Sequence, residues 1–175
     1  NNPYDFSFFH RRVSVTSISR SEAAINVCFL RQAATVYGQQ GLIPATGLSA
    51  GVDLRACPLD EAPVTIPPGE RRAIPSGIAI EPLMDGIAGF VYSRSGLGAV
   101  KGLTIAQGVG LIAPDYRGEI TVYLLNTAGE SYTVQCGERI ASLVFQPYLR
   151  PVFRVVPSLG TTERGSGGFG HTGNI

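Results

Sequence analysis

Charged side chains are scarce in this chain of 175 residues: they make up 15% of it, and the formal net charge is +1. The chain therefore lacks the broad positive field on which non-specific binding to DNA or to an anionic membrane depends. Lysine is nearly absent: of the 14 basic residues, one is a lysine, Lys101, and the others are arginines. Genome composition alone can produce such a bias, but arginine is also the side chain that grips phosphate with two parallel hydrogen bonds.

Histidine and cysteine are rare too, with two and three copies. Two histidines, His10 and His171, are too few for a histidine-rich metal centre. They also leave few positions for the histidine of a Ser-His-Asp hydrolase. Cys28, Cys57 and Cys136 are odd in number and lack C-x-x-C spacing, so they fit neither a disulfide framework nor a zinc site. We expect an intracellular, reducing and cytoplasmic setting, and a nuclear or viral origin stays open.

Long hydrophobic runs are missing as well, since none approaches the ~18 apolar residues that a membrane-spanning helix needs. The first segment carries Phe6, Phe8 and Phe9. It has no continuous apolar core or small-residue cleavage site, so it differs from a signal peptide. We expect neither a membrane nor a nucleic acid among the partners.

Glycine and proline, in contrast, are abundant, with 22 and 12 copies. They separate short runs rich in Val, Ile, Phe and Tyr, which predict strands. The predicted strands are 25–30, 77–81, 87–93, 118–126, 132–134, 139–146 and 148–156. No helical pattern of 10–15 residues separates them, so we predict an all-β sandwich, jelly roll or barrel. Short helical turns are predicted at Ser21 and Glu22 and over 97–100.

The length predicts one domain with flanking segments. We divide the chain into an N-terminal extension of unknown role (1–22), a β domain (23–156) and a flexible, glycine-rich C-terminal segment (157–175). The composition of the C-terminal segment cannot bury enough apolar surface to order itself. It is either a frayed end or a lid that closes over a ligand.

Two internal segments have the composition of a binding site. The turn at 92–98 combines Arg94, Ser95 and Gly96, which can neutralise, donate to and closely approach a phosphate. Segment 107–118 is predicted as a β-hairpin, two apolar strands joined by a Pro-Asp turn, whose backbone can read a flat ring while Tyr116 stacks on a sugar or base. The alternatives are an ordinary turn and a surface hairpin with Tyr116 in the core.

Five segments, read together and in order, resemble the motifs of the trimeric dUTP diphosphatase (dUTPase) family. They are AGVDL at 50–54, RSGL at 94–97, GLIAPDYRG at 110–118, GERIA at 137–141 and RGSGGFGHTG at 164–173. The resemblance implies a distorted jelly-roll or β-barrel protomer in a homotrimer with shared active sites. It also implies hydrolysis of dUTP to dUMP and pyrophosphate by water attack on the α-phosphorus, with Mg²⁺ held by the triphosphate and water and no protein metal ligands.

The resemblance also implies a set of substrate contacts. The turn at 94–96 would contact phosphate, and the backbone at 110–112 would hydrogen-bond uracil. Tyr116 would pack on deoxyribose and exclude a 2′-hydroxyl. The C-terminal segment would bind the γ-phosphate and stack on the uracil ring. The substrate-binding residues so predicted are Arg94, Ser95, Gly96, Gln107, Gly110, Leu111, Ile112, Tyr116, Arg164, Phe169, Gly170 and His171.

The chain departs from the family at the catalytic position. Ala113 stands where the family has the aspartate that deprotonates the attacking water, and losing a positioned general base costs ~10²–10⁴-fold in rate. Asp115 matches a second acidic position that is not the base, and it is a weaker candidate to substitute. Gln107, Ser142 and His171 replace an asparagine, a glutamine and a serine that are common in the family.

These departures leave several hypotheses open. The chain is either a dUTPase whose turnover is impaired by an engineered or natural change at Ala113, or a non-catalytic trimeric scaffold that binds nucleotide or regulates a partner. A deaminase of the same fold acting on dCTP would need a glutamate in the base pocket, for which the sequence has no matching motif.

Overall fold

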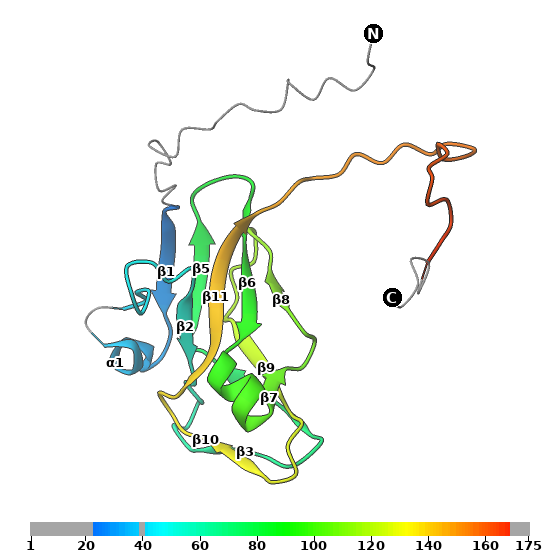
Figure 1. Cartoon of the computed structure of the whole chain (residues 1–175). Helices are drawn as coiled ribbons and strands as arrows, with labels where there is room; N and C mark the ends of the chain where they lie inside the picture. Colours follow the sequence, from blue (N-terminus) through cyan, green and yellow to red (C-terminus); the bar gives the residue numbers. More distant parts are fainter. Residues whose placement is uncertain (1–22, 39–40, 169–175) are drawn as a thin grey trace.

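Antiparallel strands build the body of the protein, which is described here from a computed structural model that covers residues 23–38 and 41–168 (Figure 1). The strands are β1 (Ile25–Phe29), β2 (Val52–Arg55), β3 (Val64–Ile66), β4 (Arg71–Pro75), β5 (Ile78–Pro82), β6 (Ile87–Ser93), β7 (Leu103–Ile105), β8 (Gly110–Ile112), β9 (Thr121–Asn126), β10 (Tyr132–Val134) and β11 (Arg139–Pro147). A short helix, α1 (Ala33–Tyr37), and one π-helical turn, η3 (Gly96–Val100), complete the elements.

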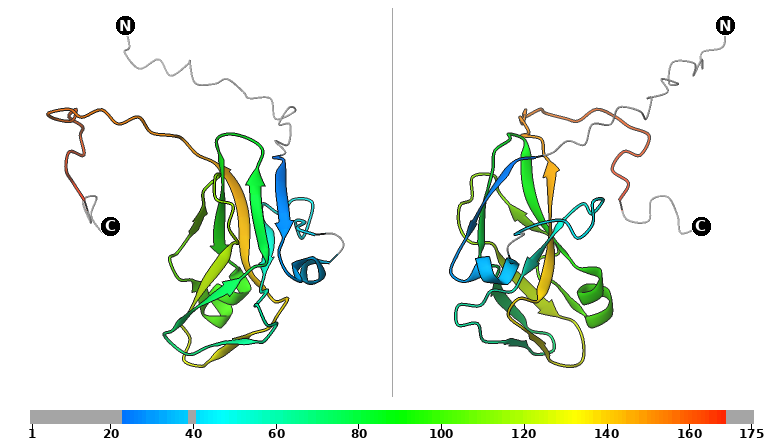
Figure 2. Two further views of the ribbon diagram at one scale, coloured as in Figure 1. Left: turned by 180° about the vertical axis from the view of Figure 1, so that it is seen from behind. Right: turned by 90° about the vertical axis from the view of Figure 1, so that its left-hand side faces the viewer.

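The strands form four sheets, with the orders β2-β11-β6-β8, β4-β9-β7, β1-β5 and β3-β10. The β3-β10 pair closes one end of the body, and the chain after β11 leaves from the opposite end (Figures 1 and 2). The sheets share one core, because buried side chains from all four form one hydrophobic cluster. Along the strands, residues alternate between buried and exposed positions. In β9, for example, Val122 and Leu124 are buried while Thr121 and Tyr123 face outwards.

The all-β prediction is confirmed, and five predicted strands match β1, β5, β6, β10 and β11 closely. The strand predicted over 118–126 begins at Thr121, and the helical turn predicted over 97–100 is η3. Strands β2, β3, β4 and β7 and helix α1 were not predicted. They have three to five residues each, too few for a hydrophobic period to stand out. The turn predicted at Ser21 and Glu22 lies outside the described residues, as does the extension 1–22.

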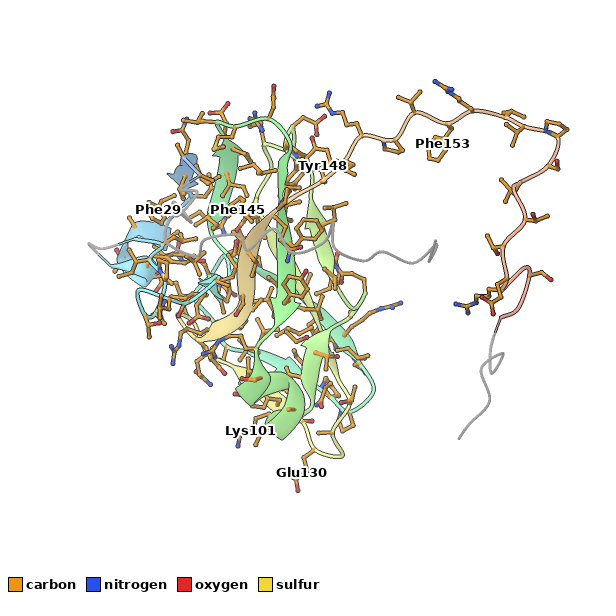
Figure 3. The ribbon with its side chains drawn as sticks, turned by 45° about the horizontal axis from the view of Figure 1, so that its top comes forward. Phe29, Lys101, Glu130, Phe145, Tyr148 and Phe153 are labelled. Atoms are coloured by element: carbon orange, nitrogen blue, oxygen red, sulfur yellow. The ribbon has the colours of Figure 1, made fainter. Side chains whose placement is uncertain are left out.

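The strand predicted over 148–156 is wrong, because β11 ends at Pro147 and the chain continues without secondary structure. Pro147 and Pro151 have no amide hydrogen to donate to a neighbouring strand. Val152 and Phe153 are each 88% exposed. Figure 3 shows Phe153 on the extended segment, well away from Phe145 in the body. No helix among the described residues has the length and apolar character needed to cross a membrane.

Asn126, at the end of β9, is a fully buried polar residue that ties three segments together. Its Nδ2 donates to the carbonyl oxygens of Ile66 and Glu130, each at 2.8 Å, and its Oδ1 accepts from the amide of Ala128 at 2.9 Å. The side chain therefore completes the backbone hydrogen bonding of the turn after β9 and joins it to β3.

Replacement of Asn126 by alanine should lower the free energy of unfolding by about 2–3 kcal/mol, because buried backbone groups lose their partners. Urea unfolding measures the change. Asn26→Ala is the matched control, since Asn26 is an exposed asparagine whose one side-chain hydrogen bond goes to Glu81, and it should change stability by less than about 0.5 kcal/mol. Equal losses in the two variants would contradict this role of Asn126.

Candidate active site

The segment predicted as a hairpin, 107–118, contains one strand, β8. The next strand, β9, begins just beyond it at Thr121, and the two strands do not pair with each other. β8 pairs with β6, with Ile112 opposite Gly89, whereas β9 pairs with β4 and β7. The hairpin prediction is therefore wrong in its pairing. The reason is that each strand finds its partner in a different sheet, and this leaves an open space between β8 and β9.

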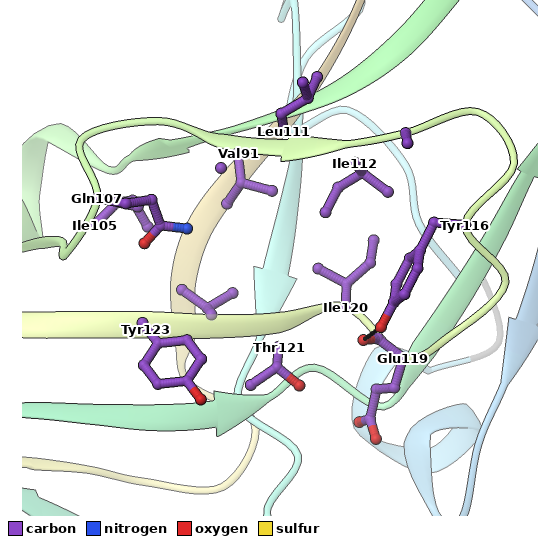
Figure 4. A pocket seen from close by; sticks show the side chains of 13 residues that line it. Val91, Ile105, Gln107, Leu111, Ile112, Tyr116, Glu119, Ile120, Thr121 and Tyr123 are labelled. Atoms are coloured by element: carbon purple, nitrogen blue, oxygen red, sulfur yellow. Dashed lines mark hydrogen bonds between the residues drawn. The ribbon is translucent and has the colours of Figure 1, made fainter.

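That space is a pocket of about 390 Å³, called here the β8–β9 pocket. β8 forms one wall and β9 the other, while Gln107 and Tyr116 lie towards opposite ends (Figure 4). Its lining residues are Val91, Ile105, Gln107, Gly110, Leu111, Ile112, Ala113, Tyr116, Glu119, Ile120, Thr121, Val122 and Tyr123. Six predicted site residues, Gln107, Gly110, Leu111, Ile112, Ala113 and Tyr116, therefore come together here.

The backbone of β8 can make hydrogen bonds in this pocket. β8 is the last strand of its sheet, so one of its edges pairs with no other strand among the described residues. Unpaired amide and carbonyl groups at a sheet edge offer alternating donors and acceptors. Gly110 is buried, and a Cβ there would lie 3.1 Å from Cβ of Val91, so the absence of a side chain lets β8 lie close to β6.

Tyr116 closes one end of the pocket with its ring. The turn that carries it is fixed by a hydrogen bond from the amide of Tyr116 to the carbonyl of Ala113 at 3.0 Å. Its hydroxyl donates to the backbone carbonyl of Glu119 at 3.1 Å. These two hydrogen bonds hold the ring in place, and 45% of the residue is exposed.

The β8–β9 pocket contains one carboxylate among its described lining residues, that of Glu119, because the lining position at 113 is alanine. The Arg31 guanidinium hydrogen-bonds this carboxylate, and together with the amide of Gly77 it holds the pKa of Glu119 below its usual range. A carboxylate with a lowered pKa that is already bound to an arginine is a poor proton acceptor. Asp115 is exposed and is not one of the residues that line this pocket.

Arg94 and Ser95 lie in a second pocket of about 360 Å³, called here the arginine pocket, beside Asp53, Arg139 and Ser142. Asp53 accepts from Nε of Arg94 at 2.9 Å and from Arg139 at 3.3 Å. A further bond of 3.2 Å joins Arg94 to the carbonyl of Arg139. These bonds leave the outer part of the Arg94 guanidinium available, a suitable geometry for a phosphate oxygen.

The two pockets have no lining residue in common. Arg94 and Ser95 therefore lie outside the β8–β9 pocket, although the pockets adjoin through a hydrogen bond of 2.9 Å from the amide of Ile105 to the hydroxyl of Ser93. Gly96 begins η3 and is exposed, and Arg164 lies on the extended C-terminal segment, where its Nε donates to the carbonyl of Gly167 at 2.9 Å. Phe169, Gly170 and His171 lie outside the described residues.

Sequence analysis missed the partners that fix these groups. Asp53 was noted only as part of a motif, yet it bridges two arginines, and Glu119 was not singled out at all. The Arg-Gly-Glu run after Tyr116 was the available signal. However, the glutamate of this run, Glu119, pairs with Arg31, which is 88 positions away in the chain. Within the described residues, no group of three or more His, Cys, Asp or Glu side chains could hold a metal ion.

The lowered pKa of Glu119 predicts a pH-dependent contribution to stability. A carboxyl group whose pKa is lower in the folded state stabilises the fold above its unfolded pKa of ~4.3, and this contribution is lost as the pH falls through its folded pKa. Glu119→Gln should therefore lower the free energy of unfolding by about 1–3 kcal/mol at pH 7. The difference from the unmodified chain should narrow as the pH is lowered towards 3.

Urea unfolding between pH 7 and pH 3 measures this difference. Glu70→Gln is the control, because Glu70 pairs with Arg72 on the surface, where their side chains are 49% and 43% exposed. A loss of stability in Glu119→Gln that stays constant down to pH 3 would show that its charge is not the cause.

Comparisons with known proteins agree with this architecture. The profile of the dUTPase family matches residues 40–173. Deoxyuridine 5'-triphosphate nucleotidohydrolase from Enterobacter sp. (strain 638) is 46% identical over 138 residues, which cover 78% of this chain and 90% of that protein. The protein of the same name from Salmonella typhi is 45% identical with the same coverage.

Solved structures share the fold. The dUTPase of Staphylococcus bacteriophage 80alpha, in a structure with dUPNHPP, aligns with a TM-score of 0.72 at 24% identity, over 86% of this chain and 98% of that one. The dUTPase of phage phi11 of S. aureus aligns with a TM-score of 0.66 at 21% identity, over 79% and 99%. The profile match and the curated relatives decide the assignment: the chain belongs to the dUTPase family of nucleotide hydrolases.

Proposed function

We propose that this chain binds dUTP together with Mg²⁺ and hydrolyses it to dUMP and pyrophosphate at a rate limited by the missing base at Ala113. The observation that carries the proposal is the composition of the β8–β9 pocket. It has a complete set of groups for a base and a sugar, yet its one described carboxylate is bound to Arg31.

Uracil recognition would fall to the free edge of β8. The Watson–Crick edge of uracil alternates carbonyl acceptors with an N–H donor, which a strand edge can match, while cytosine reverses part of the pattern. A buried mismatch of donors costs more than a matched bond gains, so the strand edge would reject cytosine. Tyr116 would pack against deoxyribose, where a 2′-hydroxyl would meet its ring.

Phosphate binding would fall to the arginine pocket. Arg94 and Ser95 would contact phosphate oxygens, and Asp53 would hold both arginines in position. Arg164, Phe169, Gly170 and His171 would close over the nucleotide from the C-terminal segment. When bound through the triphosphate and water, Mg²⁺ neutralises phosphate charge and orients the phosphates. The donor set suits this arrangement, because Asp53 already accepts hydrogen bonds from two arginines.

The separation of the two pockets supports a homotrimer. Within one chain the β8–β9 pocket and the arginine pocket are distinct and share no lining residue. We propose that each site takes its uracil side from one subunit and its phosphate side from another. We also propose an intracellular location, which agrees with three free cysteines in the described residues, one of them buried.

A non-catalytic scaffold that binds dUTP or a regulatory partner is the second candidate, and Ala113 itself favours it. A methyl group cannot take a proton from water, so a chain that binds dUTP and keeps it intact would act as a nucleotide-dependent module. The two candidates differ in whether the rest of the catalytic site is still intact.

Ala113→Asp should raise the rate of dUTP cleavage by roughly 10²–10⁴-fold, because it restores a carboxylate to the wall of the β8–β9 pocket. Pyrophosphate release is measured with dUTP, dCTP, dTTP and UTP on both proteins. Ala113→Asn is the matched control, with a side chain of similar shape that cannot act as a base. A variant that binds dUTP without faster cleavage would support the scaffold instead.

Shared sites predict that activity returns on mixing two impaired chains. The double variant Ala113→Asp/Arg94→Ala has the carboxylate but lacks the phosphate arginine, and the unmodified chain has the reverse. Each alone should be slow, whereas mixed trimers from co-expression should cleave dUTP. The control pairs the double variant with Arg94→Ala, which offers no complete site. Equal activity in both mixtures would overturn the shared-site arrangement.

A further inference from the structure

Arg31 lies outside all five sequence motifs, in the turn between β1 and α1, and has an unusual backbone conformation. Its φ is +50°, in the left-handed region that side chains other than glycine rarely adopt. Such a conformation costs of order 1–3 kcal/mol and persists where surrounding contacts hold it. The contacts of its guanidinium group identify what holds it.

The Arg31 guanidinium donates hydrogen bonds to the carboxylate of Glu119 from both of its terminal nitrogens. One of them, Nη1, lies 2.8 Å from Oε2. It also donates to the carbonyl oxygen of Cys57 at 3.2 Å. The amide of Gly77 donates to Oε1 of Glu119 at 2.7 Å. The carboxylate is therefore held by the β1–α1 turn on one side and the β4–β5 turn on the other. The two side chains are partly exposed, 26% for Arg31 and 20% for Glu119.

Glu119 in turn holds Tyr116. The backbone carbonyl of Glu119 accepts the tyrosine hydroxyl at 3.1 Å, and the ring folds back over Gly118. A Cβ at Gly118 would lie 2.3 Å from the hydroxyl oxygen and 2.5 Å from Cζ of Tyr116. The ring thus fills the space that a side chain at Gly118 would need, beside Glu119, whose carboxylate is held by other residues.

A second set of contacts anchors the same turn from its other side. Arg117 donates to the carbonyl of Pro114 at 2.7 Å and to Glu81 at 3.2 Å. These bonds fix the backbone at 114–117 but do not reach the ring of Tyr116. The hydroxyl end of the ring is held by the backbone carbonyl of Glu119, whose peptide also donates from the amide of Ile120 to the carbonyl of Ile78 at 2.9 Å. Arg31, together with the amide of Gly77, holds the side chain of the same residue.

We propose that Arg31 is a positioning residue: it fixes Glu119, which sets the Tyr116 ring against the sugar and so strengthens the preference for 2′-deoxyribonucleotides over ribonucleotides. The inference rests on the proposed function, because it needs a nucleotide sugar beside Tyr116. A ring held before binding loses no conformational freedom on binding and cannot swing aside for a 2′-hydroxyl.

Binding to the full chain tests the proposal, with non-hydrolysable analogues of dUTP and UTP titrated by calorimetry. Arg31→Met should lower the ratio of the UTP Kd to the dUTP Kd roughly three- to tenfold, the range expected for losing one oriented hydrogen bond. Arg72→Met is the matched control: Arg72 also pairs with a glutamate, on the surface at β4, and its loss should leave the ratio unchanged. Arg31→Lys, which keeps the charge but loses the two-pronged grip, should give an intermediate ratio and serves if Arg31→Met does not fold.

A double-variant comparison separates positioning from general destabilisation. In the Tyr116→Phe background the hydroxyl tether is already absent, so Arg31→Met should change the ratio little further. If Arg31→Met lowers thermal stability but leaves the ratio as in the unmodified chain, or lowers it equally in both backgrounds, the proposal is wrong.

A crystal structure of Arg31→Met without ligand gives a readout that needs no nucleotide. The proposal expects the Tyr116 hydroxyl to leave the carbonyl of Glu119, and a retained contact overturns it. If the unmodified chain binds neither analogue, the proposed function fails. The crystal structure then still decides whether Arg31 positions the ring.

Discussion

Strands β8 and β9 are joined by one connecting segment but pair in different sheets. The candidate site depends on this difference in pairing. Had they paired with each other, the hydrogen bonds of β8 would be satisfied and no space would remain between the strands. Pairing of β8 with β6 and of β9 with β4 and β7 holds the strands apart instead. The pocket is therefore a product of the sheet topology, and its free strand edge offers backbone donors and acceptors to a ligand.

The charges around this pocket are arranged for binding more than for proton transfer. Glu119 faces the pocket, but its carboxylate neutralises Arg31 and caps the amide of Gly77. It contributes to the structure of the turn that carries Tyr116. Ala113, in the same wall, adds no titratable group. Under the proposed function, different residues recognise the base and sugar and activate water, so the first task would survive a change at Ala113 that impairs the second.

The sequence predicted the all-β class, and it singled out segments that line the two pockets, because strand patterns and short motifs are local. It failed where long-range pairing decides. Segment 107–118 has the composition of a hairpin, but sheet partners far along the chain separate its strands. Residues 148–156 have the composition of a strand, but Pro151 removes a donor and the segment finds no partner strand within the described part of the chain. The ion pair between Arg31 and Glu119 could not be predicted, because no local sequence pattern relates two charged residues that are so far apart in the chain.

The most direct test of the account is to saturate the unmodified chain with dUTP and Mg²⁺, measure the bound nucleotide and identify it about a second after mixing. A typical turnover of ~10 s⁻¹ lowered roughly 10²–10⁴-fold leaves most of the dUTP uncleaved at that time. The account predicts about one nucleotide per chain, recovered largely as intact dUTP with only slow formation of dUMP. Recovery largely as dUMP and pyrophosphate at that time would show that another group replaces the missing base at Ala113. Absence of bound nucleotide would show that the β8–β9 pocket is not a dUTP site.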